Sequence, residues 1–229
     1  MEIKKNYRYF AKKGLSLLSI IGIVMLVLGV AALIFGIRDL FMLLLIIAIV
    51  CFVLSSSGKA KESDINYQVS EKVKDLEERA MIRFEVYDKD FLKIVNPAKL
   101  HGYDYISDGV YYKCGVDGKR RTSMYNGIQI FYTEKKLYVH GRRFSLLDES
   151  IDTDFGGSWS YLDLDRAQYV EREFPLPKGR SVPYQVFEIV DNNGNNVVEL
   201  SVSYGADVDK VIDDINHVIS LKKRDAGVK

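Results

Sequence analysis

The stretch GLSLLSIIGIVMLVLGVAALIFGIRDLFMLLLIIAIVCFVLSSS, residues 14–57, decides the fold of this 229-residue chain. It consists of two uncharged, strongly apolar runs, and the charged residues Arg38 and Asp39 separate them. Each run has about the length, roughly 17–25 residues, that crosses the hydrocarbon core of a bilayer as a helix. We therefore predict a transmembrane hairpin of two helices over residues 14–57.

Positive charge flanks this hairpin on the side of its two ends. The basic residues in the arm 1–13 and directly after the second run are Lys4, Lys5, Arg8, Lys12, Lys13, Lys59 and Lys61. Because Lys and Arg near the ends of spans stay in the cytoplasm, both termini are expected in the cytosol, with a very short tip outside. A cleaved signal peptide does not fit, since a second span follows at once. The expected location is the cytoplasmic (inner) membrane.

Small residues recur on one side of the first run. Gly22, Gly29 and Gly36 are seven residues apart, and Ala32 precedes Gly36 by four. Such stripes let helix backbones approach closely in lipid. Two uses fit this pattern: packing of the first span on the second, or self-association and docking on the span of a partner.

Residues 58–83 have the pattern of a juxtamembrane helix rich in Glu and Lys. Its apolar residues fall at helical spacing: Ile65, Val69, Val73, Leu76 and Ala80. The stripe is narrow and has too few heptads to define a coiled coil. Two arrangements therefore stay open, a free stalk and a helix that lies against the following domain.

Residues 84–229 are expected to form an α+β domain of about seven antiparallel strands. Asp117-Gly118 predicts a hairpin turn, Gly141 is interpreted as a turn between two short strands, and Pro175 and Pro177 indicate a loop. The expected strands are 110–116, 121–132, 136–140, 143–147, 158–164, 167–172, 184–190 and 197–203. Residues 207–223 close the domain as an amphipathic helix.

This order of elements resembles a pleckstrin-homology-like (PH-like) domain over residues 109–223. The resemblance is carried by TEKKLYV at 133–139, WSYLDL at 159–164 and the run DGKRRTSMY at 117–125. Similar runs occur in uncharacterised bacterial membrane proteins that join a two-span hairpin to a PH-like domain. The resemblance implies a β-barrel or sandwich capped by the C-terminal helix, and a binding or scaffolding module.

The first expected hairpin carries a basic cluster. Its members are Lys113, Lys119, Arg120 and Arg121. In eukaryotic PH domains, basic residues on the equivalent hairpin bind inositol phosphates, although the spacing of the cations differs here. Each basic residue near an anionic leaflet contributes about 1 kcal/mol of attraction. The cluster is therefore a candidate lipid-headgroup site, and the alternative is an ordinary solvated tip.

Composition narrows the function classes. The chain has a formal net charge of +1, of which +4 falls on residues 1–57 and −3 on the rest. Nucleic-acid binding, which needs a basic surface, is not expected. We find no catalytic constellation, metal-ligand spacing or cofactor motif in the sequence. We therefore expect a non-enzymatic, membrane-anchored scaffold that binds an unknown protein partner. Anionic-lipid sensing and an accessory role in a membrane enzyme or transporter complex are the alternatives.

Overall fold

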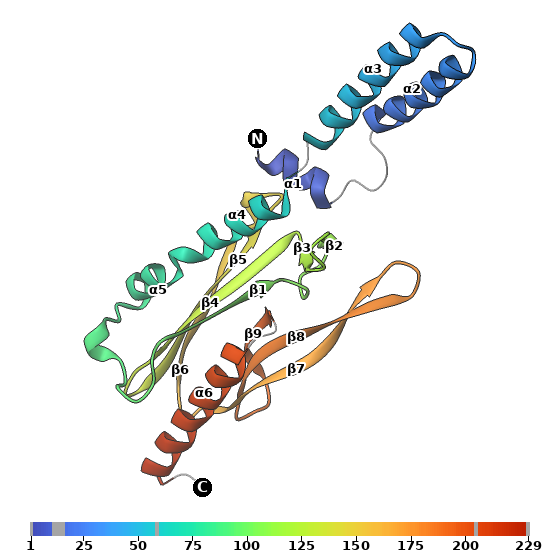
Figure 1. The fold of residues 1–229 in the computed structure, drawn as a ribbon. Coiled ribbons are helices and arrows are strands. Elements are labelled where there is room, and N and C mark those ends of the chain that lie inside the picture. Colours follow the sequence, from blue (N-terminus) through green and yellow to red (C-terminus); the bar gives the residue numbers. More distant parts are fainter. Residues whose placement is uncertain (1, 11–16, 58–59, 204–205, 228–229) are drawn as a thin grey trace. The chain divides into compact units, whose positions relative to one another are not determined.

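The computed structural model describes residues 2–10, 17–57, 60–203 and 206–227 (Figure 1). The chain divides into two compact units, Met1–Asp64 and Ile65–Lys229. Helices make up the first unit, and the second combines antiparallel sheets with helices, which confirms the α+β class. Lys12, Lys13, Lys59 and the expected starts of the first span at Gly14 and of the juxtamembrane helix at residue 58 lie outside the described residues.

The first unit contains helices α1 (Glu2–Phe10), α2 (Leu17–Ile34) and α3 (Arg38–Ser57). Both α2 and α3 are long and apolar enough to cross a membrane. Their large apolar side chains are mostly exposed, as the 62% exposure of Val27 illustrates. A surface of this kind suits hydrocarbon rather than water, so these helices suggest membrane association.

Three residues of the small-residue stripe lie on the buried side of α2. Gly22, Gly29 and Ala32 are the buried residues of α2. A Cβ atom on Gly22 would come within 3.3 Å of the Phe52 ring, and one on Gly29 within 3.5 Å of the Leu44 Cβ, so both glycines face α3. This arrangement is the packing of the first helix on the second.

Gly36 differs from the other small residues because it forms the turn after α2. Its φ angle is +80°. The Gly36 N–H donates to the Leu33 carbonyl at 3.0 Å, and the Ile37 N–H donates to the Ala32 carbonyl at 2.9 Å. These two bonds form a Schellman motif, which places glycine at the left-handed residue that ends a helix.

The second unit begins with helices α4 (Glu62–Lys74, from Ile65 onward) and α5 (Leu76–Phe84). The sequence predicted one helix, and the structure separates two at Asp75. The apolar stripe is buried along both helices: Ile65, Val69, Val73, Leu76 and Ala80. The helices therefore lie against the sheets, as the packed alternative predicted.

A four-stranded antiparallel sheet lies beneath these helices, in the order β1-β4-β5-β6. Its strands are β1 (Ala98–Tyr103), β4 (Met124–Tyr132), β5 (Lys136–Ser145) and β6 (Thr153–Ser160). Every residue of β4 is buried, because helices cover one face of the sheet and the main core lies on the other. Two short 3₁₀ turns, Asp88–Asp90 and Glu149–Ile151, lie in the connections.

Gly127 of β4 allows the helices to approach the sheet closely. A Cβ atom there would lie 2.8 Å from the Leu76 Cδ1 and 3.4 Å from the Val73 Cγ1. An ion pair at 3.3 Å between Lys72 on α4 and Asp152 also ties this helix to the sheet. Sterics and charge thus fix the position of the helical layer.

The interpretation of Gly141 as a turn is wrong. Residues 136–145 form one continuous strand, and Gly141 is paired with Phe155 of β6. The Phe155 ring occupies the space where a side chain would stand, since a Cβ atom on Gly141 would come within 2.3 Å of it. Glycine is therefore used for close packing across the sheet at this position, not for a change of chain direction.

A three-stranded antiparallel sheet follows, with strands β7 (Leu164–Leu176), β8 (Arg180–Asp191) and β9 (Asn196–Val202). The expected loop at the prolines is shorter than predicted, because Pro175 lies within β7 and is paired with Ser181. Since β7 is an edge strand of this sheet, proline costs it little.

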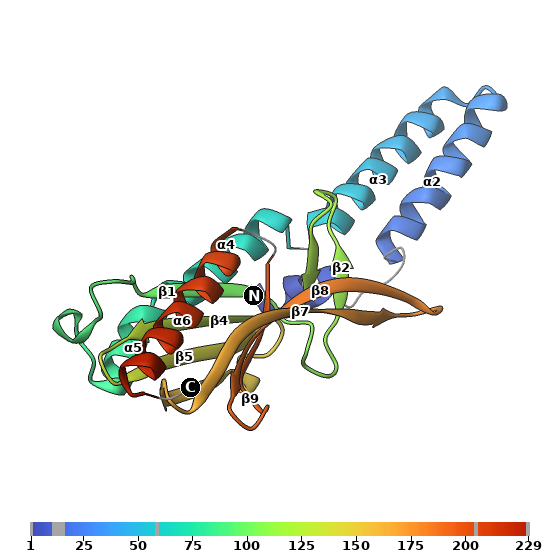
Figure 2. The ribbon, with the colours of Figure 1, turned by 90° about the horizontal axis from the view of Figure 1, so that it is seen from below.

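Helix α6 (Ala206–Asp225) closes the unit, as the sequence predicted. It packs on β7 and reaches β1 (Figure 2). The core between the sheets and this helix includes Ile128, Phe187, Leu200, Ile215 and Val218, all fully buried or nearly so. The expected barrel is not formed, because the sheets are not closed; two packed antiparallel sheets, roughly a sandwich, take its place.

Candidate functional site

A small hairpin interrupts the chain between β1 and β4, and it carries the basic cluster. Its strands are β2 (Tyr112–Cys114) and β3 (Arg120–Thr122), which pair with each other in a separate two-stranded sheet. Gly118 has a φ angle of +73°, so the predicted Asp117-Gly118 turn is confirmed. The described residues contain nine strands where about seven were expected. Both strands of this hairpin overlap expected strands, 110–116 and 121–132, whereas β1 was not expected.

The two ends of this insertion lie side by side. The Asp104 N–H donates to the Met124 carbonyl at 3.0 Å, and the Thr122 hydroxyl donates to the Asp104 carbonyl at 2.8 Å. Asp104 is fully buried, and its carboxylate lies 2.9 Å from the Arg143 Nε. The base of the hairpin is thus anchored to the four-stranded sheet.

The pairing of β2 with β3 divides the basic cluster between two faces. Lys113 is paired with Arg121, and Cys114 with Arg120, so these two pairs point to opposite sides. Arg121 is fully buried, whereas Lys119 and Arg120 are exposed. Lys113 is half-buried. The four cations therefore do not converge on one point.

Arg121 holds the hairpin together and joins it to α4. Its NH1 and NH2 groups donate to the two carboxylate oxygens of Asp117 at 2.8 and 2.6 Å. Its NH2 group also donates to the Asn66 side-chain oxygen at 3.2 Å. This guanidinium keeps the pKa of the Asp117 carboxyl well below its usual range. Because its donors are engaged inside the protein, Arg121 belongs to the framework.

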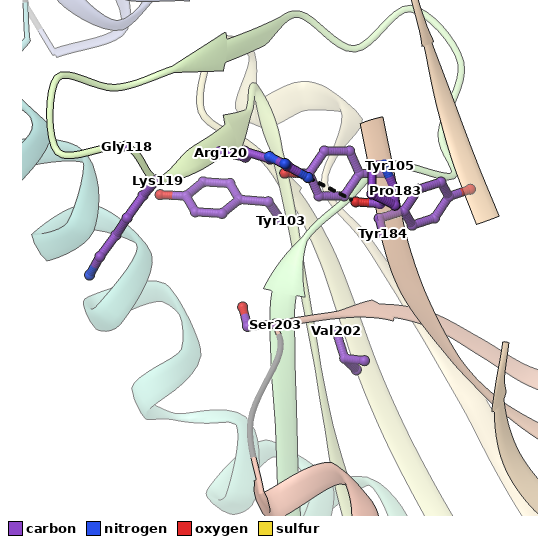
Figure 3. A pocket seen from close by; sticks show the side chains of 9 residues that line it. All are labelled: Tyr103, Tyr105, Gly118, Lys119, Arg120, Pro183, Tyr184, Val202 and Ser203. Atoms are coloured by element: carbon purple, nitrogen blue, oxygen red, sulfur yellow. Dashed lines mark hydrogen bonds between the residues drawn. The ribbon is translucent and has the colours of Figure 1, made fainter. Parts of the chain in front are cut away.

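Lys119 and Arg120 instead line a cavity of about 690 Å³ beside the hairpin (Figure 3). We call it the hairpin groove. The residues that line it are Tyr103, Tyr105, Gly118, Lys119, Arg120, Pro183, Tyr184, Val202 and Ser203. Arg120 spans the groove, since its NH1 group donates to the Pro183 carbonyl at 3.2 Å.

The rings of Tyr105 and Tyr184 form one wall of the groove, and Phe174 and Tyr112 extend this aromatic cluster beyond the groove lining. The Tyr105 ring stacks on Tyr184 with centroids 5.2 Å apart and meets the edge of Phe174 at 5.6 Å. Tyr112 of the hairpin lies 6.0 Å from Phe174. Burial raises the pKa of the Tyr105 hydroxyl.

The floor of the groove lies where the two larger sheets meet. A Cβ atom on Gly102 of β1 would come within 2.8 Å of the Ser201 carbonyl oxygen and the Ser203 nitrogen. Only glycine allows this approach of backbone to backbone. The Tyr105 N–H also donates to the Ser201 hydroxyl at 3.1 Å, which fixes the start of the insertion against β9.

A second cavity, of about 790 Å³, lies between the end of α5, the β4–β5 turn and the end of α6. It is rich in lysine, with Lys89, Lys93, Lys135 and Lys222 in its lining. Lys222 is engaged there by Glu134 at 2.5 Å. In the part of the chain that the structure describes, no group of His, Cys, Asp and Glu side chains could hold a metal ion.

The sequence pointed to the hairpin but not to the groove. Lys119 and Arg120 were found because they follow a recognisable turn. Tyr105, Pro183 and Tyr184 were missed as site residues, because only the tertiary fold brings them to the hairpin. Comparisons of the chain with family models, with curated proteins and with solved structures give no match.

Proposed function

We propose that this chain is a non-enzymatic binding and scaffold module, anchored in the inner membrane, whose folded domain takes a protein partner in the hairpin groove. The observation that carries the proposal is the groove itself. An aromatic wall, two exposed cations and the backbone of β8 meet there around a space of about 690 Å³. Aromatic residues and arginine are the side chains most enriched at protein interfaces.

The anchor is the α2–α3 hairpin. Its exposed apolar surface and its uncharged length support a two-span segment. The basic residues near its two ends support cytosolic termini and a short outer tip at Gly36. Confinement at the membrane raises the local concentration of the domain, so even a weak affinity for a membrane-bound partner is sufficient.

The PH-like assignment of the domain rests on the order of its strands. Within residues 109–223, the range of the resemblance, strands β2 to β9 are antiparallel and the helix α6 follows them. A run of antiparallel strands closed by a C-terminal helix supports the resemblance, and β1 lies before that range. Such domains are binding modules, so the assignment supports partner binding and implies no catalytic activity.

A lipid-sensing role is the second candidate, because Lys119 and Arg120 are exposed at the tip of the hairpin. Val116 at the same tip is 99% exposed and adds an apolar contact. With Arg121 buried, however, few cations of the cluster remain for an anionic surface, and each contributes about 1 kcal/mol. A groove with an aromatic wall and an open strand edge favours a protein ligand.

Site-specific photo-crosslinking in living cells tests the proposal. A photoreactive p-benzoylphenylalanine replaces Val116 at the rim of the hairpin, and in a control chain it replaces Leu162, which is 40% exposed. We expect a defined protein adduct from position 116 and none from position 162. An adduct with a second copy of this chain assigns self-association instead. Crosslinks to lipid alone at position 116 contradict the proposal and favour lipid sensing.

A further inference from the structure

The backbone of β8 presents an open edge inside the hairpin groove. Residues 180–184 pair with β7 on one side, whereas β9 pairs with β8 from Gln185 onward. Among the described strands, none lies beside residues 180–184 on the groove side. Unpaired backbone groups at a sheet edge are a template for an added strand.

The direction of these backbone groups is known from Arg120. Because its guanidinium donates to the Pro183 carbonyl, that carbonyl points into the groove. Backbone groups two residues apart on a strand face the same edge, so Ser181 presents its N–H and C=O there as well. Pro183 has no N–H, and the edge therefore offers two acceptors and one donor at these two positions.

The charge of the groove selects an acidic ligand. Among its nine lining residues are the cations Lys119 and Arg120 and no carboxylate. When an incoming N–H takes over the Pro183 carbonyl, the Arg120 guanidinium becomes available to a carboxylate. Such charge-assisted, bidentate bonds are about twice as strong as neutral hydrogen bonds.

The opposite wall selects an apolar residue. Tyr105, Tyr184 and Val202 line it, and the first two rings are stacked on each other. Side chains of an added strand alternate between its two faces, so one ligand can present acidic and apolar residues to different walls. An extended peptide satisfies all three features of the groove, whereas a compact ligand leaves the β8 edge unpaired.

We infer that the hairpin groove binds an extended segment of the partner protein, which carries acidic and apolar residues and adds as a strand beside residues 180–184 of β8. The inference rests on the proposed function, since it names the ligand of the same groove. Arg120 is then the specificity residue. In the free protein its side chain covers the open edge of β8, and in the complex it pairs with the acidic side chain of the ligand.

The probe is a phage-displayed library of random nonapeptides, selected on the full-length protein in lipid nanodiscs. We expect enriched peptides to contain Asp or Glu together with aliphatic or aromatic residues. A synthetic copy of the leading peptide should bind the K119E/R120E protein at least about tenfold more weakly, because like charges then meet in the groove. The matched control, K89E/K93E, reverses two lysines at the second cavity and should leave the affinity unchanged.

Backbone methylation of the peptide tests strand addition itself. N-methylation at alternate residues should weaken binding about tenfold or more in one register and leave it nearly unchanged in the other, because only every second N–H pairs with the edge. Equal tolerance of both registers overturns strand addition. Unchanged binding of the peptide to the K119E/R120E protein overturns the preference for acidic residues. This comparison requires that K119E/R120E and K89E/K93E melt at the temperature of the unmodified protein.

Failure of this inference is distinguishable from failure of the proposed function. If position 116 crosslinks a protein equally well in the K119E/R120E background, the scaffold role stands and the inferred ligand is wrong. If the library yields no acidic peptide and phosphatidylglycerol vesicles bind instead, with the same sensitivity to K119E/R120E, the inference is overturned. An absence of any protein adduct at position 116 contradicts the proposed function as well.

Discussion

Helix α2 of the first unit and helices α4 and α5 of the second bury opposite kinds of residue. The buried residues of α2 are small, and its large apolar side chains are exposed. The buried residues of α4 and α5 are mostly branched and apolar, and most of their charged residues are exposed. The comparison teaches that the two units suit different solvents. The surface of α2 suits hydrocarbon, where packing needs small residues, and that of α4 suits water, where the hydrophobic effect buries large ones.

The largest effect is expected from removing the water-adapted helices. A fragment of residues 60–229 should unfold cooperatively, whereas residues 84–229 should not, because the helix-facing side of the four-stranded sheet becomes exposed. That side includes Phe144, whose ring lies 5.3 Å from the Lys72 Nζ, and Gly127, against which the Leu76 side chain packs. Thermal melting followed by circular dichroism measures the difference. Cooperative melting of 84–229 at the temperature of the longer fragment would show that the helices are dispensable.

A pair of lysine substitutions sharpens the comparison of the two solvents. Val27 of α2 and Ile82 of α5 are exposed to similar extents, 62% and 70%. V27K should disfavour membrane insertion by about 2.5–3.5 kcal/mol, because the lysine enters hydrocarbon. I82K should change the free energy of unfolding by no more than about 0.5 kcal/mol, because that position faces water. An insertion assay with glycosylation acceptor sites reads the first effect, and urea unfolding of residues 60–229 reads the second. Equal tolerance of both substitutions would remove the distinction between the helices.

The smallest effect concerns pH and the interface between α5 and the sheet. His140 of β5 is 1% exposed, and the Arg83 NH1 group lies 3.0 Å from its Nδ1. Burial lowers the pKa of His140. At pH values above the unfolded-state pKa, about 6.5, both states are neutral; as the pH falls below it, the unfolded state binds a proton first and stability declines.

We therefore expect residues 60–229 to lose stability between pH 7.5 and 5.5, and H140Q to lose less over the same range. Urea titrations at a series of pH values measure both slopes. A residual slope should remain, because burial also lowers the pKa of His101. Identical slopes for the two proteins would show that His140 does not carry the pH dependence.

The sequence predicted those parts of the fold that depend on local periodicity. The apolar stripe from Ile65 to Ala80, the Asp117-Gly118 turn and the C-terminal helix each have a short-range signal, and each is present. Gly141 was misjudged because a glycine required by a ring on the neighbouring strand looks, in sequence, like a glycine required by a turn.

The candidate site was predictable only in part for the same reason. Lys119 and Arg120 follow a local turn, so the sequence reveals them. Strand alternation moves Arg121 to the opposite face, and its pairing with Asp117 and Asn66 depends on where α4 packs. Tyr184 reaches the groove from far along the chain. Long-range contacts of this kind leave no periodic trace in a single sequence.

The closeness of Asp104 to Thr122 and Met124 has a consequence for how this domain can change over evolutionary time. Because the chain leaves the sheet and returns to it at neighbouring points, the whole excursion between them can be lengthened, shortened or exchanged without altering the strand order around it. The groove depends on that excursion, whereas the core does not. The cationic side of the groove, Lys119 and Arg120, is thus encoded in a stretch of about twenty residues that is separable from the core, and a new binding preference can arise by exchanging that stretch alone.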